Sequence, residues 1–274
     1  MIWTKELFGV EKPVIALLHL NPFPGDPRFV DGTDSMEKMA ADARKDLKAL
    51  QDGGVDGILF SNEFSFPYPE KADPIIGCGM ARVIGELKQE IRLPFGIDLE
   101  ADPMAAIDLA AAVGADFIRG TFNGTYVGVL GVTAPDIAAV LRRKHALRLD
   151  KLKMLYFLNN EADSYLVPVD YAELATSIIF NCKPDAFCVA GAHAGLEVSN
   201  DLIERTRDRV RSSGVPVFAA TGCKAENIKE KLAIADGVLV GTTLKENGMF
   251  ERHIDPARVV EFMSKVSEYR SGQA

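Results

Sequence analysis

The stretch VPVFAATGCKAENIKEKLAIADGVLVGTT, residues 215–243, contains two copies of one design. In each copy a short apolar run ends at a glycine with a hydroxyl residue beside it, at 221–222 and at 241–243. Glycine lets a ligand approach the backbone closely, and the N-terminus of a following helix favours negative charge. Two such strand ends, side by side at the end of an alternating chain, are typical of the phosphate site of a (β/α)8 barrel.

The rest of the chain repeats this alternation of apolar runs and amphipathic stretches. The strands are predicted at 13–20, 57–63, 94–100, 117–122, 153–160, 186–191, 215–222 and 237–243. They are short, apolar and bounded by Gly, Pro or Asp, as expected for strands that are buried on both faces.

Helices are predicted at 36–54, 102–114, 200–214 and 255–270, and the first three end at a glycine. Eight βα units with short returns favour a closed parallel barrel over an open doubly wound sheet. We therefore predict an α/β fold, a single eight-stranded TIM-barrel domain over residues 1–274. The phosphate-type site would lie at strands seven and eight, and the last helix would close the barrel.

Length and charge fit this fold and narrow the partners. The chain has 274 residues, and a (β/α)8 barrel typically needs about 250. Its formal net charge of −8 argues against binding to nucleic acids or anionic membranes, which attract basic surfaces. The sequence shows neither a signal-peptide pattern nor a long apolar run. The four cysteines form no CxxC pair, so we expect reduced thiols in a cytoplasmic protein.

The candidate catalytic residues stand where predicted strands end. In a TIM barrel the site is built at the C-terminal ends of the strands, and strand alternation sorts side chains by face. Asp98 is thereby expected in the barrel mouth, near Glu63, Arg119 and His193. Crowded carboxylates acquire different pKa values, so one can act as an acid and another as a base. We predict these four residues as catalytic; the alternative for Asp98 is a structural ion pair with Arg119.

A second set of residues is predicted to bind the ligand. The strand tips of 215–243 would hold a phosphate through backbone amides and hydroxyl groups, and Lys245 would steady the anion. Asn160 could hydrogen-bond ligand hydroxyl groups or begin a turn. Glu100 could instead cap a helix, and His19 could be a hydrogen-bonded core residue. The predicted set is His19, Asn62, Glu100, Asn123, Asn160, Thr221, Gly222, Gly241, Thr242 and Lys245.

Two other chemistries receive less support. Glu63, Asp98, Glu100 and His193 would suit a divalent ion by ligand type, but the chain has no local motif such as HExxH. The lysines near strands lie at the wrong end of the predicted barrel or on its phosphate side, which disfavours a Schiff-base aldolase. We therefore predict no cofactor and keep a divalent metal as the alternative.

Four segments resemble the BtpA/SgcQ family. They are KPVIALLHLNPFPGDPRF, GGVDGILFSNEFSFPYP, AAVGADFIR and ADGVLVGTTLKENGMF, beginning at residues 12, 53, 111 and 235. The resemblance implies a TIM barrel with phosphate-binding character at the last two strands. It links one branch to photosystem I biogenesis and another to carbohydrate-utilisation genes, and it implies no particular reaction.

The resemblance also assigns individual positions. The residues that fit its strand motifs are His19, Pro22, Pro24 and Gly25 in the first, Asn62 and Pro67 in the second, and Gly241 and Lys245 in the last. Ser61 and Ser65 stand where the photosynthetic branch usually has acidic residues, and IDLEAD replaces its Asn-rich third-strand end. The chain therefore resembles the carbohydrate-linked branch more closely.

These observations predict an enzyme of carbohydrate metabolism that acts on a phosphorylated sugar or nucleotide-like molecule. The expected chemistry is carboxylate acid/base catalysis of isomerase, epimerase or lyase type. One alternative is hydrolysis of a ribosyl bond, in which the aromatic loop 63–73 stacks on a base. Another is a non-catalytic assembly factor. The same aromatic loop could equally pack in the interface of a homo-oligomer.

Overall fold

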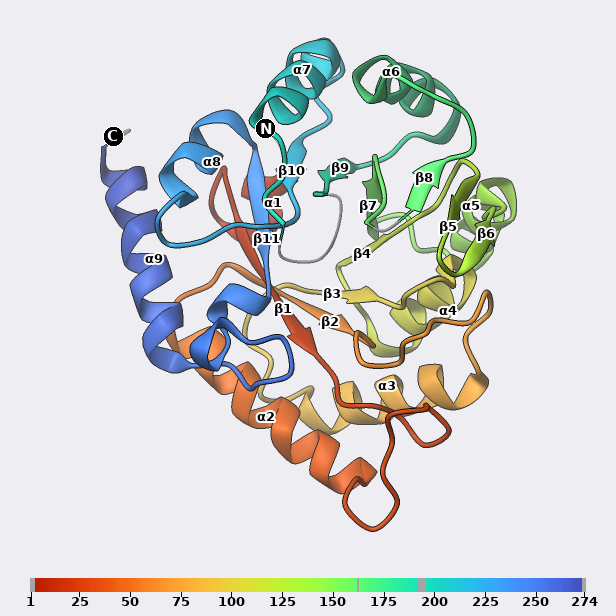
Figure 1. The fold of residues 1–274 in the computed structure, drawn as a ribbon, viewed down its shortest axis with the longest axis vertical. Coiled ribbons are helices and arrows are strands. Elements are labelled where there is room, and N and C mark those ends of the chain that lie inside the picture. Colours follow the sequence, from red (N-terminus) through yellow and green to blue (C-terminus); the bar gives the residue numbers. More distant parts are fainter. Residues whose placement is uncertain (1–2, 162, 192–195, 273–274) are drawn as a thin grey trace.

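The computed structural model describes residues 3–161, 163–191 and 196–272. Within these residues eight parallel strands close into a barrel, in the order β1-β11-β10-β9-β7-β4-β3-β2 (Figure 1). The barrel strands are β1 Val14–His19, β2 Gly57–Ser61, β3 Phe95–Asp98, β4 Phe117–Gly120, β7 Lys153–Phe157, β9 Ala186–Val189, β10 Val217–Ala219 and β11 Gly237–Val240. Each lies inside a predicted segment, so the TIM-barrel prediction is confirmed.

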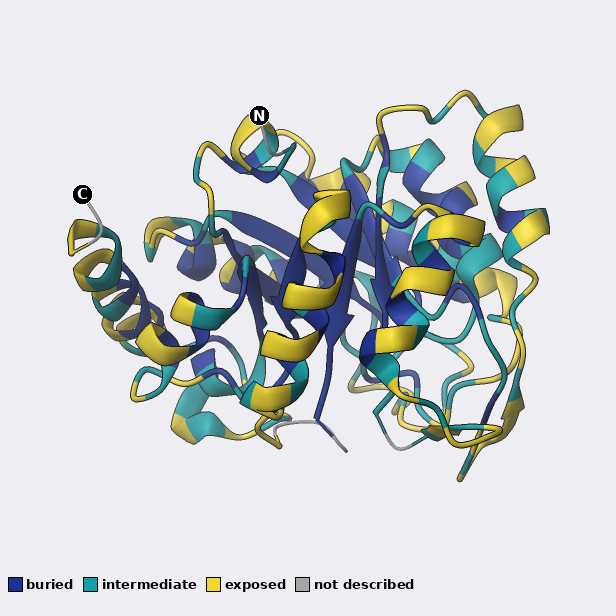
Figure 2. Cartoon of the chain, turned by 90° about the horizontal axis from the view of Figure 1, so that it is seen from above, coloured by how far each residue is buried: buried dark blue, intermediate teal, exposed yellow. Residues whose placement is uncertain are grey.

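Helices surround this barrel and expose one face each to solvent (Figures 1 and 2). They are α2 Met36–Asp52, α3 Pro74–Leu87, α4 Pro103–Val113, α5 Ile137–Ala146, α6 Tyr171–Cys182, α7 Asn200–Val210, α8 Ile228–Ile234 and α9 Pro256–Ser271. Local sequence sets their ends: Ser35 accepts a hydrogen bond from the Lys38 amide at the start of α2, and Gly114 ends α4 in the left-handed conformation. Helix α9 packs between α8 and α2, which completes the ring.

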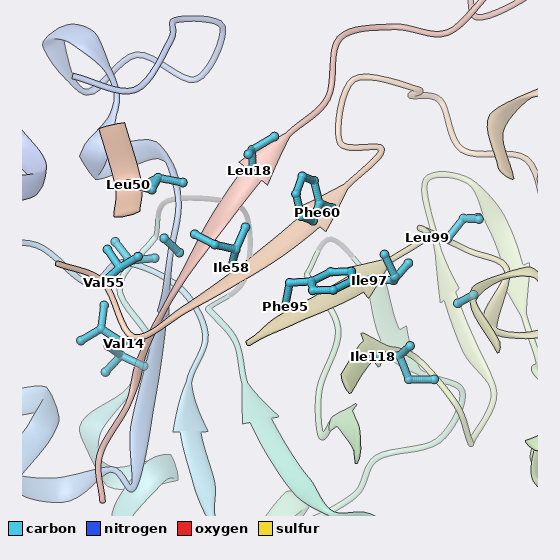
Figure 3. Packing of buried hydrophobic residues seen from close by; sticks show 14 of the residues in the cluster. Val14, Leu18, Leu50, Val55, Ile58, Phe60, Phe95, Ile97, Leu99 and Ile118 are labelled. Carbon is cyan, nitrogen blue, oxygen red and sulfur yellow. The ribbon is translucent and has the colours of Figure 1, made fainter. Parts of the chain in front are cut away.

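Strand alternation divides the apolar side chains into two cores. Val14, Leu18, Ile58 and Phe60 face the helices, where they pack with Leu50 of α2 (Figure 3). The residues that face the barrel interior instead include Ile15, Leu17, Leu59, Phe117, Leu155, Phe218 and Leu239. In β3, Phe95 and Ile97 belong to the helix-facing core, which confirms the predicted parity and places Asp98 on the inner face.

A short N-terminal helix covers the lower end of the barrel, where the strands begin. Helix α1, Trp3–Phe8, was not predicted from the sequence. Its Phe8 ring lies edge-on to Phe117, with 5.7 Å between ring centroids, and the Trp3 indole donates to the Asp185 carbonyl. This end of the barrel is therefore filled by side chains, and the open end is the C-terminal one.

A small antiparallel sheet beside the mouth was also not predicted. It is formed by β5 Tyr126–Gly128, β6 Gly131–Thr133 and β8 Asp163–Tyr165, in the order β6-β5-β8. It joins the segments that follow β4 and β7, and it lies near α5 in Figure 1. Among the described residues no helix combines the length and hydrophobicity that a bilayer crossing requires.

Candidate functional site

A cavity of about 810 Å³ opens at the C-terminal ends of the barrel strands. This volume is in the range of small-molecule sites. Its polar lining comes from strand ends, from the loops that follow them, and from the helices near residues 242–243 and 258. The polar and charged lining residues are His19, Glu63, Tyr68, Asp98, Glu100, Asp102, Arg119, Thr121, Thr133, Asn160, Glu161, Asp163, Thr221, Lys224, Glu226, Thr242, Thr243 and Arg258.

The centre of the cavity holds an ion pair between β3 and β4. Asp98 is fully buried, and its Oδ2 accepts hydrogen bonds from Nε and Nη2 of Arg119. The same guanidinium lies 3.6 Å from Glu100 Oε1 and 4.8 Å above the centre of the Phe157 ring. The pair that the sequence left as an alternative to catalysis is therefore formed. Asp98 Oδ1 is buried and has no hydrogen-bond partner among the described residues.

Three glutamates surround this pair and titrate differently from free glutamate. Burial raises the pKa of Glu63, and the Asp98 charge adds to this while Arg119 opposes it. Burial raises the pKa of Glu100 well above its ordinary value, with Asp98 and Glu63 adding to the effect. Burial also raises the pKa of Glu161 to about 7, with Arg119 opposing. A carboxyl group whose pKa is about 7, as at Glu161, can exchange protons near neutral pH.

Glu63 is oriented by its own strand. It follows β2, and its Oε2 accepts a hydrogen bond of 3.1 Å from the Ser61 hydroxyl. The Glu63 carbonyl accepts a second bond from the Tyr68 hydroxyl, which holds the loop after β2 against the cavity wall. Asn62 faces away from the cavity, where its Oδ1 accepts the Glu100 amide at 2.8 Å. Asn62 thus positions the backbone of a cavity residue.

At the opposite wall of the cavity the chain presents backbone amides. Beyond β11 the chain turns into a short 3-10 helix, η2 Thr242–Leu244. The amides of Leu244 and Lys245 bond to the carbonyls of Gly241 and Thr242, and no acceptor among the described residues engages the amides of 241–243. Gly241, Thr242 and Thr243 line the cavity, so a ligand can reach this wall.

The β10 tip completes the same wall by a different geometry from the predicted one. Gly222 has φ +69°, and a side chain there would lie 2.3 Å from Glu197 Cα, so the position requires glycine. The sequence predicted a direct strand-to-helix junction, but α8 begins only at Ile228. A loop therefore supplies the backbone here, and the predicted contribution of a helix N-terminus is absent. Thr221 Oγ1 accepts the Gly191 amide.

Two cations border this wall, and the sequence analysis did not predict either as a ligand residue. Arg258, in the first turn of α9, donates from Nε to the Thr243 carbonyl at 2.8 Å and lines the cavity. Lys224, in the loop after β10, is exposed and also lines it. Arg258 was missed because it belongs to the helix that closes the barrel. Its position directly after the Asp255–Pro256 helix start was the only available signal.

Lys245 does not reach the cavity. Its side chain is 2% exposed, and Nζ donates to the Phe250 carbonyl at 2.5 Å while lying over the Phe64 ring. Burial lowers its pKa to about 8. Asn123 is likewise buried and does not line the cavity. Lys245 is thus placed as a structural cation behind the wall.

The remaining predicted residues are placed as follows. Asn160 lines the cavity, and its Oδ1 accepts the Thr121 hydroxyl at 2.7 Å. His19 lines it from the end of β1. His193 lies outside the described residues. Within the described residues, no group of three or more His, Cys, Asp or Glu side chains is arranged to hold a metal ion.

A family model supplies the identification. The BtpA family model matches residues 10–268. The chain belongs to the BtpA family. The match includes every barrel strand and all the residues that line the cavity.

Two relatives are similar to this chain over most of its length. A BtpA-family protein of Escherichia coli K12, putative sgc region protein SgcQ, is 43% identical over 270 residues, covering 98% of this chain and 100% of its own. The photosystem I biogenesis protein BtpA of Synechocystis is 28% identical over 266 residues, covering 96% and 91%. The greater identity to SgcQ agrees with the branch that the residues around Ser61 and Ser65 indicated.

Solved structures agree with the fold. A structure described as native KDPGal superposes with a TM-score of 0.59 and 14% identity, covering 97% of this BtpA-family chain and 99% of the other. At this identity the likeness concerns the barrel alone.

Proposed function

We propose that the protein is an enzyme that acts on a phosphorylated sugar or nucleotide-like molecule by carboxylate acid/base chemistry. The observation that carries the proposal is one cavity with two chemically different walls. At β10 and β11, bare amides and hydroxyl groups stand beside Arg258 and Lys224. At β2, β3 and β7, Glu63, Asp98 and Glu161 line the same space.

The first wall suits a phosphate ester. Phosphate oxygens accept hydrogen bonds from backbone amides, and a guanidinium adds a paired charge. The Arg258 side chain is held by the Thr243 carbonyl, which brings it beside the amides that precede Leu244. A phosphoryl group bound here would leave the rest of the substrate pointing across the cavity toward β2 and β3.

The second wall suits proton transfer. In the proposed reaction Glu63 removes a proton from the substrate. Asp98 supplies a second carboxylate near Glu63, and Arg119 balances the negative charge of Asp98. A carboxyl group whose pKa is about 7, as at Glu161, can return a proton at neutral pH. Proton transfer of this kind contributes roughly 10²–10⁴-fold to rate. The products would be those of an isomerase, epimerase or lyase.

The relatives support this reading at a coarser level. SgcQ, the more similar relative, is named for its place in the sgc region. The resemblance of the present chain to the carbohydrate-linked branch supports our proposal of a role in carbohydrate metabolism. The Synechocystis relative is a photosystem I biogenesis protein, so an assembly role without catalysis is the second candidate. A ribosyl-bond hydrolase is the third, because Phe66 lines the cavity where it could stack on a base.

Ligand-induced stabilisation separates these candidates. Pentose and hexose phosphates, nucleotides and free nucleosides would each be added to the protein in thermal unfolding. A ligand at 100 times its Kd adds about 2.7 kcal/mol, which raises Tm by on the order of 5 °C for a chain of this size. We expect the effect from phosphate esters, and we expect it to survive EDTA because the proposed chemistry needs no metal or organic cofactor.

A matched pair of variants tests the phosphate wall. Arg258→Gln should abolish the stabilisation by phosphate esters, whereas Arg252→Gln, an exposed arginine outside the cavity, should preserve it. Equal behaviour of the two variants would contradict the proposed wall. Stabilisation by nucleosides alone would favour ribosyl hydrolysis, and stabilisation only by a protein partner would favour the assembly role. Light scattering on the same samples tests the predicted homo-oligomer.

A further inference from the structure

His19 lies in the cavity wall without a hydrogen-bond partner. Its side chain is 8% exposed, and neither Nδ1 nor Nε2 has a donor or acceptor among the described residues. Buried polar groups are nearly always hydrogen-bonded, and leaving one unpaired is costly. Because His19 also lines the cavity, a molecule bound in the cavity can supply the missing partner.

The position of the ring between the two walls is fixed on both sides. Its Nε2 lies 3.1 Å from the point that a side chain at Gly241 would occupy, so the glycine leaves the space that the imidazole fills. On the other side, His19 pairs with Ser61 in the β1–β2 register, and Ser61 donates to Glu63. His19 therefore stands between the amides after β11 and the Glu63 carboxylate.

The surroundings keep this imidazole neutral. The Phe64 and Phe250 rings lie at 6.0 and 5.5 Å between centroids. Burial lowers the pKa of His19 well below its ordinary value, and the nearby charges of Lys245 and Arg119 lower it further. A neutral imidazole has one N–H donor and one acceptor nitrogen, which suits a hydroxyl or carbonyl oxygen better than an anion.

We propose that His19 is the residue that recognises an oxygen on the carbon next to the phosphate-bearing carbon of the substrate. The inference rests on the proposed function, since the phosphoryl group at 241–243 sets the position from which that oxygen is counted. It narrows the substrate class to phosphate monoesters that carry a hydroxyl or carbonyl group at this adjacent carbon. The substrate carbon that follows this adjacent carbon then lies toward Glu63.

Two probes that differ only at that position test the proposal. Glycerol 3-phosphate carries a hydroxyl group next to its phosphate-bearing carbon, and 3-hydroxypropyl phosphate, which has the same terminal hydroxyl group, does not. The protein should bind glycerol 3-phosphate about five- to tenfold more tightly, as expected for one added hydrogen bond. His19→Leu should reduce this ratio to about one, and His19→Gln, which keeps a donor, should retain part of it. His145→Gln, on an exposed helical face, should leave the ratio unchanged.

Nitrogen-15 NMR of the unmodified protein measures the protonation state and hydrogen bonding of the His19 ring directly. The chain has four histidines, so the His19 signals can be identified by their loss in His19→Gln. They should show a neutral ring from pH 6 to 8 and should shift with glycerol 3-phosphate but not with 3-hydroxypropyl phosphate. Equal affinity for both probes, or a His19 ring that titrates near 6.5, would overturn the inference while leaving the phosphate wall intact. If neither probe binds, the phosphate wall is wrong and the inference falls with it.

Discussion

At the residue scale, the Asp98–Arg119 pair shows one contact with both a structural and a chemical role. The guanidinium is 5% exposed and the carboxylate is fully buried, so each charge depends on the other for compensation. Asp98 nevertheless lines a cavity that is also lined by Glu63 and Glu161, and its Oδ1 has no hydrogen-bond partner among the described residues. A group held this firmly has a fixed orientation, which favours catalysis as well as stability.

Asp98→Asn and Glu63→Gln should therefore differ in their effects. Asp98→Asn removes the fully buried carboxylate that pairs most closely with Arg119, so we expect a loss of about 3–5 kcal/mol in the free energy of unfolding. Glu63→Gln should change stability little and reduce turnover of an identified substrate by roughly 10²–10⁴-fold. Denaturant unfolding and steady-state rates measure the two effects, with Glu70→Gln, exposed on the same loop, as the control. Undiminished turnover in both Asp98→Asn and Glu63→Gln would refute the acid/base assignment.

The raised pKa of Glu161 predicts a pH-dependent stability. Burial raises it from 4.5 to about 7 in the folded protein, so the folded state holds this proton more strongly than the unfolded state does. The resulting stability is fully present below pH 4.5 and is lost as the pH rises through 7. Glu161→Gln removes the loss and should make the protein more stable than the unmodified chain at pH 8, by up to about 3 kcal/mol, but not at pH 4.5. Parallel stability curves for the two proteins would exclude this protonation difference.

At the element scale, the strand tips depend on glycine conformation. Gly222 and Gly32 both have positive φ, but only Gly222 lacks space for a side chain, because Glu197 lies behind it. Gly222→Ala should displace the loop after β10 and weaken binding of propyl phosphate more than tenfold. Gly32→Ala introduces a similar conformational strain, but its added side chain meets no neighbouring atom. It should therefore leave the affinity for propyl phosphate unchanged. Calorimetric titration of both variants measures this difference.

The elements that the sequence did not predict have weak patterns for identifiable reasons. Strands β5, β6 and β8 have three residues each, too few for an alternation of apolar and polar positions to be recognised. The exposed apolar side chains of this sheet, such as Val127 and Val132, carry no signal of burial. Arg258 was missed because the approach of α9 to the β11 loop is set by tertiary packing. By contrast, the apolar runs of the barrel strands, bounded by Gly, Pro or Asp and alternating with amphipathic stretches, made their type and order predictable.

At the scale of the whole molecule, side chains fill the N-terminal end of the barrel, and the C-terminal end opens into the cavity. The sequence predicted the barrel and the mouth positions of Glu63, Asp98 and Arg119, because strand order and parity determine both. It could not show that Lys245 lies behind the wall, since that depends on how the Phe250 loop folds back. Residues far apart in sequence thus decide which of several suitable side chains reach the cavity.

Helix α1 allows the two ends to be tested separately. Phe8→Ala should cost about 3 kcal/mol of stability, because the ring fills the lower end of the barrel. It should not change the affinity for phosphate esters. Trp3, the only tryptophan of the chain, packs at the same end, so its fluorescence should report unfolding but not ligand binding. A fluorescence change on addition of a phosphate ester would show that the two ends are coupled.

The side chains that fill the lower end of the barrel also restrict how small molecules reach the cavity. With Phe8, Phe117 and Phe218 occupying the interior, the described residues offer passage to the cavity only from the mouth. The substrate must therefore enter, and the product must leave, through the mouth of the cavity. An enzyme with a single entrance of this kind should show competitive inhibition by its own product. Saturating product should also protect the cavity-lining residues Lys224 and Tyr68 from chemical labelling.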